Sequence, residues 1–148
     1  MEIEFSKEQY NSLIKAVSIA NWISSSIDDE EFANSINELQ NLEQYIFSQN
    51  EKFEANDKIY MEPELKEYYP TNELEEDIAP MLDNYDDFVF WEELTHRLAR
   101  RDFVDEYGEE KVSNMDPLNR MELEEEFLVK YSEEFSTNGI GRLTIQKK

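Results

Sequence analysis

The stretch DPLNRMELEEEFLVKYSEEFSTNG, residues 116–139, carries residues typical of both ends of a helix. Asp116 suits the capping position, and Pro117 is preorganised for the first helical residue. Gly139 is typical of the residue that follows a helix. Apolar residues recur between these ends at helical intervals, namely Leu118, Met121, Phe127, Leu128, Tyr131 and Phe135. The stretch therefore predicts a helix.

Two earlier segments begin with similar signals. Ser6 is followed three residues later by Gln9, which is a capping box and predicts a helix over about 7–25. Asp28 stands in the same relation to Glu31 and predicts a second helix over about 29–52. The apolar stripe of this second helix consists of Phe32, Ile36, Leu39, Ile46 and Phe53, with Leu42 on its flank.

The middle of the chain is less regular. Residues 54–72 lose the helical period and contain Pro63 and Pro70, so we expect a loop there. Thr71 could cap a short helix that ends or kinks near Pro80. A further helix is predicted from Asp86 to a stop at Gly108, with inward-facing residues Phe88, Trp91, Leu94, Leu98 and Val104.

Both ends of the chain alternate apolar and polar residues, Ile3 and Phe5 at one end and Leu143 and Ile145 at the other. Each end is either a short half-buried strand or a frayed tail, and the two alternatives stay open. A length of 148 residues fits one domain. The expected fold is an all-α, single-domain bundle of four or five helices over residues 1–148, with or without a two-stranded pairing of the termini.

The charge of the chain limits its partners. The sequence holds 36 acidic and 14 basic side chains, a formal net charge of −22. Direct nucleic-acid binding and docking on anionic membranes are disfavoured, because both need Lys and Arg. The charge favours a basic partner, and simple solubility is an equal alternative. There is no cysteine, and no basic segment followed by an apolar run at the start, so we expect a cytoplasmic protein.

The sequence offers little for catalysis. His96 is the only histidine, and Glu93-x-x-His96 has the spacing of a di-iron carboxylate bundle, with Glu92 one turn away. Such a bundle needs two such pairs and the chain supplies one, so a helical charge ladder is preferred. The three glycines all lie from Gly108 onward, which excludes a phosphate-binding loop in the earlier part. We expect no catalytic residue, no cofactor and no metal site.

Candidate interaction residues fall into three groups. The segment from Ala16 to Ile27 has no charged residue and is either buried or a docking face, with Trp22 off its main stripe. Two acidic groups follow, formed by Asp28, Asp29, Glu30 and Glu31 and by Glu73, Glu75, Glu76 and Asp77. The basic group consists of Arg97, Arg100 and Arg101. The preferred interpretation of the arginines is helical pairing of Glu93 with Arg97 and of Arg101 with Asp105, and the alternative is a docking point for an acidic group.

Two functions remain as hypotheses. The first is a non-enzymatic acidic interaction module, an inhibitor, adaptor or immunity-type protein that docks on a basic surface. Its sharper version is a nucleic-acid mimic, because a compact domain about 38 Å across matches a length of duplex DNA that carries roughly 22 phosphate charges. The partner would then be a nucleic-acid-binding protein. The alternative is a metal-dependent helical bundle that uses Glu92, Glu93 and His96. Neither hypothesis fixes the oligomeric state.

Two segments carry a resemblance, FWEELTHRLARRD at 90–102 and YSEEFSTNG at 131–139. They look like segments of a set of bacterial proteins of similar length to which no function is attached. The resemblance implies a bacterial source and nothing about activity.

Overall fold

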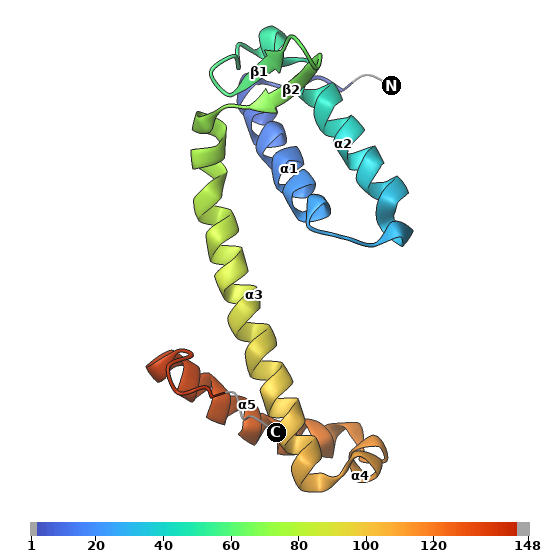
Figure 1. Ribbon diagram of the computed structural model, residues 1–148, viewed down its shortest axis with the longest axis vertical. Helices are drawn as coiled ribbons and strands as arrows, with labels where there is room; N and C mark the ends of the chain where they lie inside the picture. Colours follow the sequence, from blue (N-terminus) through green and yellow to red (C-terminus); the bar gives the residue numbers. More distant parts are fainter. Residues whose placement is uncertain (1–2, 145–148) are drawn as a thin grey trace. The chain divides into compact units, whose positions relative to one another are not determined.

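The computed structural model describes residues 3–144, which form five α-helices and one two-stranded antiparallel sheet (Figure 1). The predicted all-α class with a small strand pairing is thereby confirmed. Within the described residues, no helix combines the length and apolarity needed to cross a membrane. The chain divides into two compact units, Met1–Asp83 and Asn84–Lys148. The expectation of a single domain stays a prediction.

Helix α1 of the first unit spans Lys7–Ser25, as predicted. Its capping box is formed, since the Gln9 amide donates to Ser6 Oγ at 3.2 Å and the Ser6 amide donates to Gln9 Oε1 at 2.9 Å. Tyr10, Ile14 and Val17 are buried on one face. The capping bonds satisfy amides at the helix start that have no partner within the helix.

The predicted second helix is divided into three parts, a 3₁₀ turn η1 at Glu30–Phe32, helix α2 at Ala33–Phe47 and a 3₁₀ turn η2 at Asn50–Phe53. Its buried face coincides only in part with the predicted stripe. Glu43, Phe47 and Asn50 are buried, whereas Phe32 and Leu39 are 46% and 37% exposed. The prediction of Phe32 and Leu39 as core residues was wrong.

The segment predicted as a loop contains the sheet. Strands β1, Ile59–Glu62, and β2, Glu67–Pro70, pair with Ile59 opposite Pro70. The sheet does not involve the termini, because residues 3–6 and 143–144 have no regular structure and the rest of the predicted terminal strands lies outside the described residues. Pro70 stands at the end of its strand, where a missing amide hydrogen costs little.

Helix α3 spans Asn72–Tyr107 as one helix where two were predicted. Pro80 lies inside it, so the sequence signal for an end or kink did not divide the helix. A proline there removes one hydrogen bond of the helical ladder, and the remaining turns keep the helix continuous. The stop at Gly108 is confirmed, since this glycine adopts φ +82° directly after the helix.

The core of the first unit joins α1, α2, the sheet and the first turns of α3. It consists of Tyr10, Ile14, Val17, Phe47, Ala55, Ile59, Leu74, Ile78 and Leu82. The Tyr10 ring stacks on Phe53 with centroids 4.2 Å apart, and the Tyr10 hydroxyl donates to the Ile46 carbonyl at 2.8 Å. The buried polar atom of this tyrosine is therefore satisfied.

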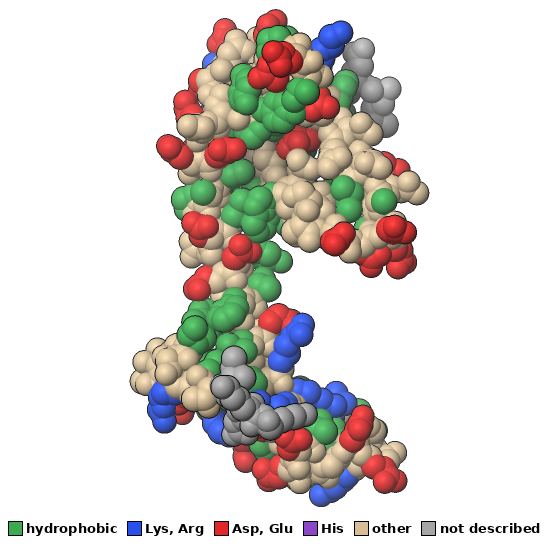
Figure 2. Space-filling model, viewed as in Figure 1, with side chains coloured by type: hydrophobic (Ala, Val, Ile, Leu, Met, Phe, Trp, Pro, Cys, Tyr) green, Lys and Arg blue, Asp and Glu red, His purple; other side chains and the backbone are tan. Residues whose placement is uncertain are grey.

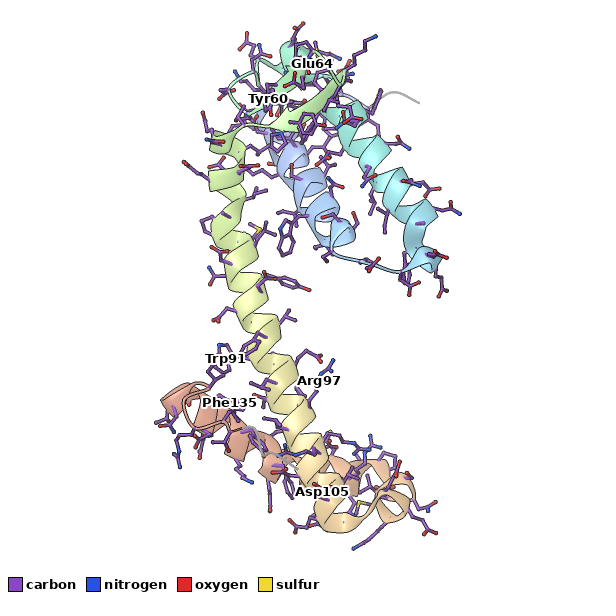
Figure 3. All side chains as sticks on the ribbon, in the orientation of Figure 1. Tyr60, Glu64, Trp91, Arg97, Asp105 and Phe135 are labelled. Carbon is purple, nitrogen blue, oxygen red and sulfur yellow. The ribbon has the colours of Figure 1, made fainter. Side chains whose placement is uncertain are left out.

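The second unit contains the rest of α3, a short helix α4 at Glu109–Ser113 that was not predicted, and α5 at Pro117–Asn138, whose bounds were predicted. Its buried apolar residues are Ala99, Phe103, Val112 and Phe135. Trp91 of α3 and Phe135 of α5 point toward one another, with ring centroids 5.6 Å apart (Figure 3). The inward placement predicted for Phe88 was wrong, because it is 62% exposed, and Leu118 and Met121 of the predicted apolar pattern in α5 are also more than 60% exposed.

Candidate functional site

A cleft of about 690 Å³ opens on the first unit. Its walls come from four elements, α1, α2, β2 and the first turns of α3. The residues that line it include Ser18, Asn21, Trp22, Ser25, Gln40, Asn41, Glu43, Gln44, Glu67, Tyr68, Glu75, Ile78 and Leu82. A concave site that mixes apolar walls with a few polar groups is the usual form of a binding site.

Glu43 of α2 is the most unusual residue of the cleft, because its carboxylate is charged in water yet the residue is only 8% exposed. The Asn21 side-chain amide donates to Glu43 Oε2 at 2.8 Å. No lysine or arginine among residues 3–144 forms an ion pair with it. Burial disfavours the charged form and raises the pKa of Glu43 to about 7.

Asn21 brings an unsatisfied hydrogen-bond acceptor to the same cleft. While its Nδ2 donates to Glu43, its Oδ1 is buried and has no hydrogen-bond partner in the described part of the chain. A buried acceptor without a donor costs free energy, so such groups are rare in folded proteins. The cleft therefore holds a carboxylate and an amide oxygen that both accept hydrogen bonds, and Asn21 Oδ1 lacks a matching donor.

The side-chain amide of Gln44 fixes one wall of the cleft. Gln44 Nε2 donates to the Tyr68 carbonyl at 2.8 Å, and the Tyr68 amide donates to Gln44 Oε1 at 2.8 Å. This pair of bonds replaces a neighbouring strand along β2 and ties the sheet to α2. Trp22 lies on another wall and is 39% exposed, as expected for a residue off the main stripe of α1.

The uncharged segment 16–27, predicted to be either buried or a docking face, is partly buried and partly exposed. Val17, Ser18 and Ser24 are buried, whereas Ile23 and Ile27 are 42% and 39% exposed together with Trp22. The buried serine hydroxyls bond to carbonyls of their own helix, as in the 2.8 Å bond from Ser18 Oγ to the Ile14 carbonyl. One face of the segment packs inward, and the other leaves apolar surface open.

The first acidic group lies at the turn between α1 and α2, where all four side chains are exposed and acidic side chains gather (Figure 2). Asp29 has a local structural role, because its carboxylate accepts the Glu31 amide at 3.0 Å. Asp28, Glu30 and Glu31 form no ion pair within residues 3–144. Their charge is thus open to an external partner.

The second acidic group serves the fold in part. Asp77 pairs with Lys58 at 2.8 Å and with Lys15 at 3.1 Å, and Glu73 lies 3.8 Å from Lys58. Hydrogen bonds from Lys58 and Lys15 lower the pKa of Asp77. Glu75 lines the cleft and Glu76 is exposed. The group predicted as one docking patch is therefore divided between ion pairing and the cleft.

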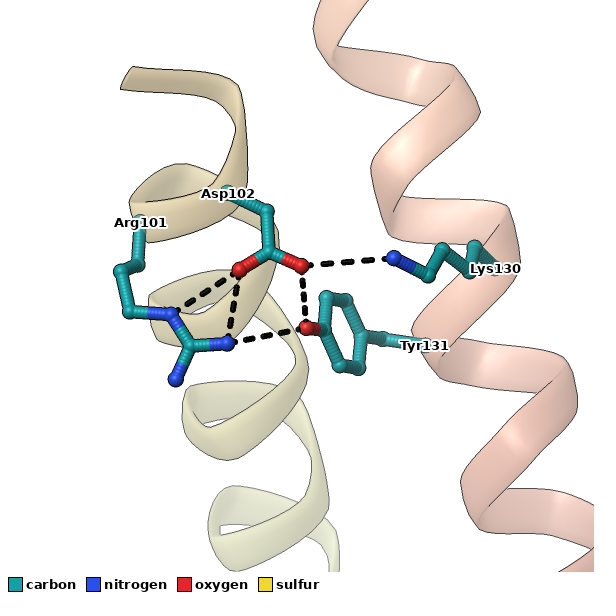
Figure 4. Close-up of polar contacts among 4 residues, drawn as sticks. All are labelled: Arg101, Asp102, Lys130 and Tyr131. Carbon is teal, nitrogen blue, oxygen red and sulfur yellow. Dashed lines mark hydrogen bonds and ion pairs between the residues drawn. The ribbon is translucent and has the colours of Figure 1, made fainter. Parts of the chain in front are cut away.

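The three arginines all have acidic partners within the second unit. Arg97 pairs with Glu93 at 2.9 Å, as predicted, and Arg100 lies 3.5 Å from Glu124. The predicted partner of Arg101 was wrong, since its Nη2 lies 2.6 Å from Asp102, and Asp105 forms no ion pair with any described residue (Figures 3 and 4).

Asp102 is the centre of a polar cluster between α3 and α5. It receives hydrogen bonds from Arg101, from Lys130 at 3.3 Å and from the Tyr131 hydroxyl (Figure 4). Partial burial opposes its ionisation, but the hydrogen bonds from Tyr131, Arg101 and Lys130 outweigh this and lower the pKa of Asp102. Arg100, through Glu124, and Arg101, through Asp102 and Tyr131, therefore contribute to the packing of α3 against α5, whereas Arg97 pairs within α3.

His96 is exposed, and its Nε2 lies 3.6 Å from the Glu92 carboxylate. Nowhere in residues 3–144 do three or more His, Asp or Glu side chains lie together in a way that could hold a metal ion. The geometry around Glu92, Glu93 and His96 is that of a helical charge ladder.

Neither Glu43 nor Asn21 was predicted as a site residue, although a signal for Glu43 was present. Glu43 follows Leu39 by four residues and precedes Ile46 by three, so it occupies an inward position of the predicted stripe. A carboxylate at such a position marks a buried charge. Asn21 has no comparable signal, because only the packing of α1 against α2 places it beside Glu43.

No family model, curated protein or solved structure matches this chain.

Proposed function

We propose that the protein is a non-enzymatic, acidic interaction module, an inhibitor, adaptor or immunity-type protein, whose first unit docks on a basic protein surface. Residues 1–83 contain 20 acidic and five basic side chains, a formal charge of −15, and residues 84–148 contain 16 and nine, a charge of −7. All five arginines lie in the second unit. The negative field is therefore concentrated on the first unit, where it speeds encounter with positive surfaces.

The observation that carries the proposal is the lining of the cleft. Three acidic residues line it, Glu43, Glu67 and Glu75, and no lysine or arginine of the described chain does so. Elsewhere in this unit, acids such as Asp77 have lysine partners within the chain. A concave surface with unbalanced negative charge is complementary to a partner that projects positive charge.

A nucleic-acid-binding protein is the partner class that this charge fits best, because such proteins present Lys and Arg in arrays. The protein would then act as a nucleic-acid mimic. The same charge opposes direct contact with nucleic acid or an anionic membrane. We place this interaction in the cytoplasm, where such partners act.

The test begins with capture of proteins from bacterial lysate by the full chain at about 50 mM salt, followed by purification of the captured protein. We expect a basic protein that forms a stoichiometric complex by light scattering, that dissociates at about 300 mM salt, and that is displaced by duplex DNA. Capture that resists salt, or a partner of acidic or neutral charge, would contradict the proposal.

A further inference from the structure

We propose that the cleft of the first unit binds one arginine side chain of the basic partner, with the guanidinium group held by the Glu43 carboxylate and Asn21 Oδ1 beside Trp22. This inference rests on the proposed function, because it names the group that the partner inserts. It assigns a role to Asn21 Oδ1, which lacks a hydrogen-bond partner in the described part of the chain, and to a carboxylate that has no ion-pair partner there.

The buried position of Glu43 favours binding of a cation. Glu43 as a residue is more than nine-tenths buried, and its carboxylate accepts one hydrogen bond, from the neutral Asn21 amide. A buried carboxylate that lacks a positive neighbour destabilises the protein whenever it is ionised. Strongly perturbed groups concentrate at functional sites, so this position favours a role in binding.

The surrounding charges favour the same ligand. Besides Glu43, the cleft lining includes Glu67 from β2 and Glu75 from α3, while the other polar residues from α1 and α2 are neutral. Glu67 keeps an intramolecular bond, because the Tyr69 hydroxyl donates to its Oε2 at 2.7 Å. These acidic residues would repel an entering anion and attract an entering cation.

Arginine fits the acceptors better than lysine. The acceptors belong to two side chains on different helices, Glu43 Oε and Asn21 Oδ1, and a planar guanidinium group has donors pointing in several fixed directions. Trp22 offers an aromatic surface for stacking, and Ile78 and Leu82 offer apolar surface for the methylene groups. A guanidinium group is also less strongly hydrated than an ammonium group, so its transfer into the cleft costs less.

The direct test is a titration of the ¹⁵N-labelled full chain at pH 8 with the blocked pentapeptide Gly-Gly-Arg-Gly-Gly. We expect saturable shifts of the Asn21 side-chain amide and the Trp22 indole signals. The matching peptide with citrulline, which has the same shape without the charge, should cause no saturable shift. The pentapeptide Gly-Gly-Lys-Gly-Gly should bind less tightly than the arginine peptide. Tighter binding of this lysine peptide, or equal shifts with the citrulline peptide, would overturn the inference.

Glu43→Gln removes the buried charge and keeps an acceptor for Asn21, and it should weaken binding of the arginine peptide about tenfold or more. The matched control is Glu38→Gln, an exposed residue on the same helix that does not line the cleft, and it should change binding less than about twofold. Thermal unfolding of both variants establishes that they fold.

Binding of the captured basic protein to the two variants distinguishes this inference from the proposed function. If the captured basic protein binds Glu43→Gln as tightly as Glu38→Gln, docking stands and the arginine site is wrong. If no basic protein is captured while the arginine peptide still binds through Glu43, the cleft stands and the proposed function is wrong.

Discussion

Asn21 of α1 donates a 2.8 Å hydrogen bond to the buried Glu43 carboxylate of α2, and this contact joins the two helices at the centre of the cleft. The bond satisfies one lone pair of a group that burial destabilises. It leaves Asn21 Oδ1 without a donor in the described part of the chain. The pair therefore lowers the free energy of unfolding of the protein.

Neutralising Glu43 should stabilise the protein at high pH. The folded pKa of Glu43, about 7, lies above the 4.5 that is usual for a glutamate, so the folded state retains a proton that the unfolded state has lost. Stability therefore falls as pH rises from about 4.5 to 7, by at most roughly 1.4 kcal/mol for each pH step of one. We expect Glu43→Gln to raise the free energy of unfolding by about 2–3 kcal/mol at pH 8.

The same variant should gain less than about 1 kcal/mol at pH 5, because the native carboxyl group is then protonated in the folded state. Urea unfolding followed by Trp22 emission in a Trp91→Phe background measures both values. Glu38→Gln is the control and should shift stability little at either pH. A Glu43→Gln variant less stable than the wild type at pH 8 would show that this carboxylate has an internal partner.

Arginine binding should depend on pH through the same group. Binding needs the ionised carboxylate, so affinity for the arginine pentapeptide should rise between pH 6 and pH 8 and then level off. Glu67 and Glu75 also line the cleft, and the Glu43→Gln variant measures how much they contribute to arginine binding without Glu43. Its affinity should stay flat over this range in the peptide titration. A pH dependence that survives in the variant would assign the effect to the other carboxylates.

In the second unit, Asp102→Asn should weaken the packing of α3 against α5. The change removes charge-assisted bonds from Arg101, Lys130 and Tyr131 and should cost roughly 1–2 kcal/mol. Urea unfolding followed by Trp91 emission in a Trp22→Phe background reports on this unit. Asp105→Asn, on an exposed residue with no ion pair to residues 3–144, should cost less than about 0.5 kcal/mol. Equal losses in the two variants would remove the special role of Asp102.

The Asp102 contribution should also have the opposite pH dependence to that of Glu43. Its folded pKa is lowered, so its stabilisation is present above the ordinary pKa of an aspartate and disappears as pH falls through the folded value. The difference between wild type and Asp102→Asn should shrink in acid. A constant difference down to acidic pH would contradict this assignment.

Pro80→Ala should stabilise α3. Alanine restores an amide donor inside the helix and removes a residue that costs about 3 kcal/mol in a helix interior. Part of this gain is offset, because proline also restricts the unfolded chain by about 1 kcal/mol. We expect a higher midpoint of thermal unfolding, measured by circular dichroism at 222 nm. A lower midpoint would show that the proline ring contributes packing that outweighs the lost hydrogen bond.

Local chemistry in the sequence predicted much of the fold. The capping box at Ser6, the Asp116-Pro117 pair and Gly108 each act within one helical turn, so the ends that they mark are correct. The hairpin was missed because β1 and β2 are four residues each and Ile59 is the only fully buried position of β1. Its turn includes Lys66 at φ +59°, which no glycine or asparagine signals.

The site was only half visible in the sequence. Trp22 was placed off the main stripe as a candidate interaction residue, and it is 39% exposed and lines the cleft. Glu43 and Asn21 were missed, because burial of a carboxylate depends on how α1, α2 and α3 enclose it. Asp77 was predicted as a docking residue, but Lys15 and Lys58 pair with it from distant positions of the chain. Such pairing follows from tertiary structure and has no local pattern.

The central claim, docking of the acidic first unit on a basic surface, is tested most directly by the salt dependence of the dissociation constant for the captured partner. The variant Asp28→Asn, Glu30→Gln, Glu31→Gln removes three of the four negative charges from the turn between α1 and α2, and Glu122→Gln, Glu125→Gln, Glu126→Gln makes the same charge change on α5. We predict a shallower slope of log Kd against log salt for the first variant and the wild-type slope for the second. Equal slopes for all three proteins would contradict the account.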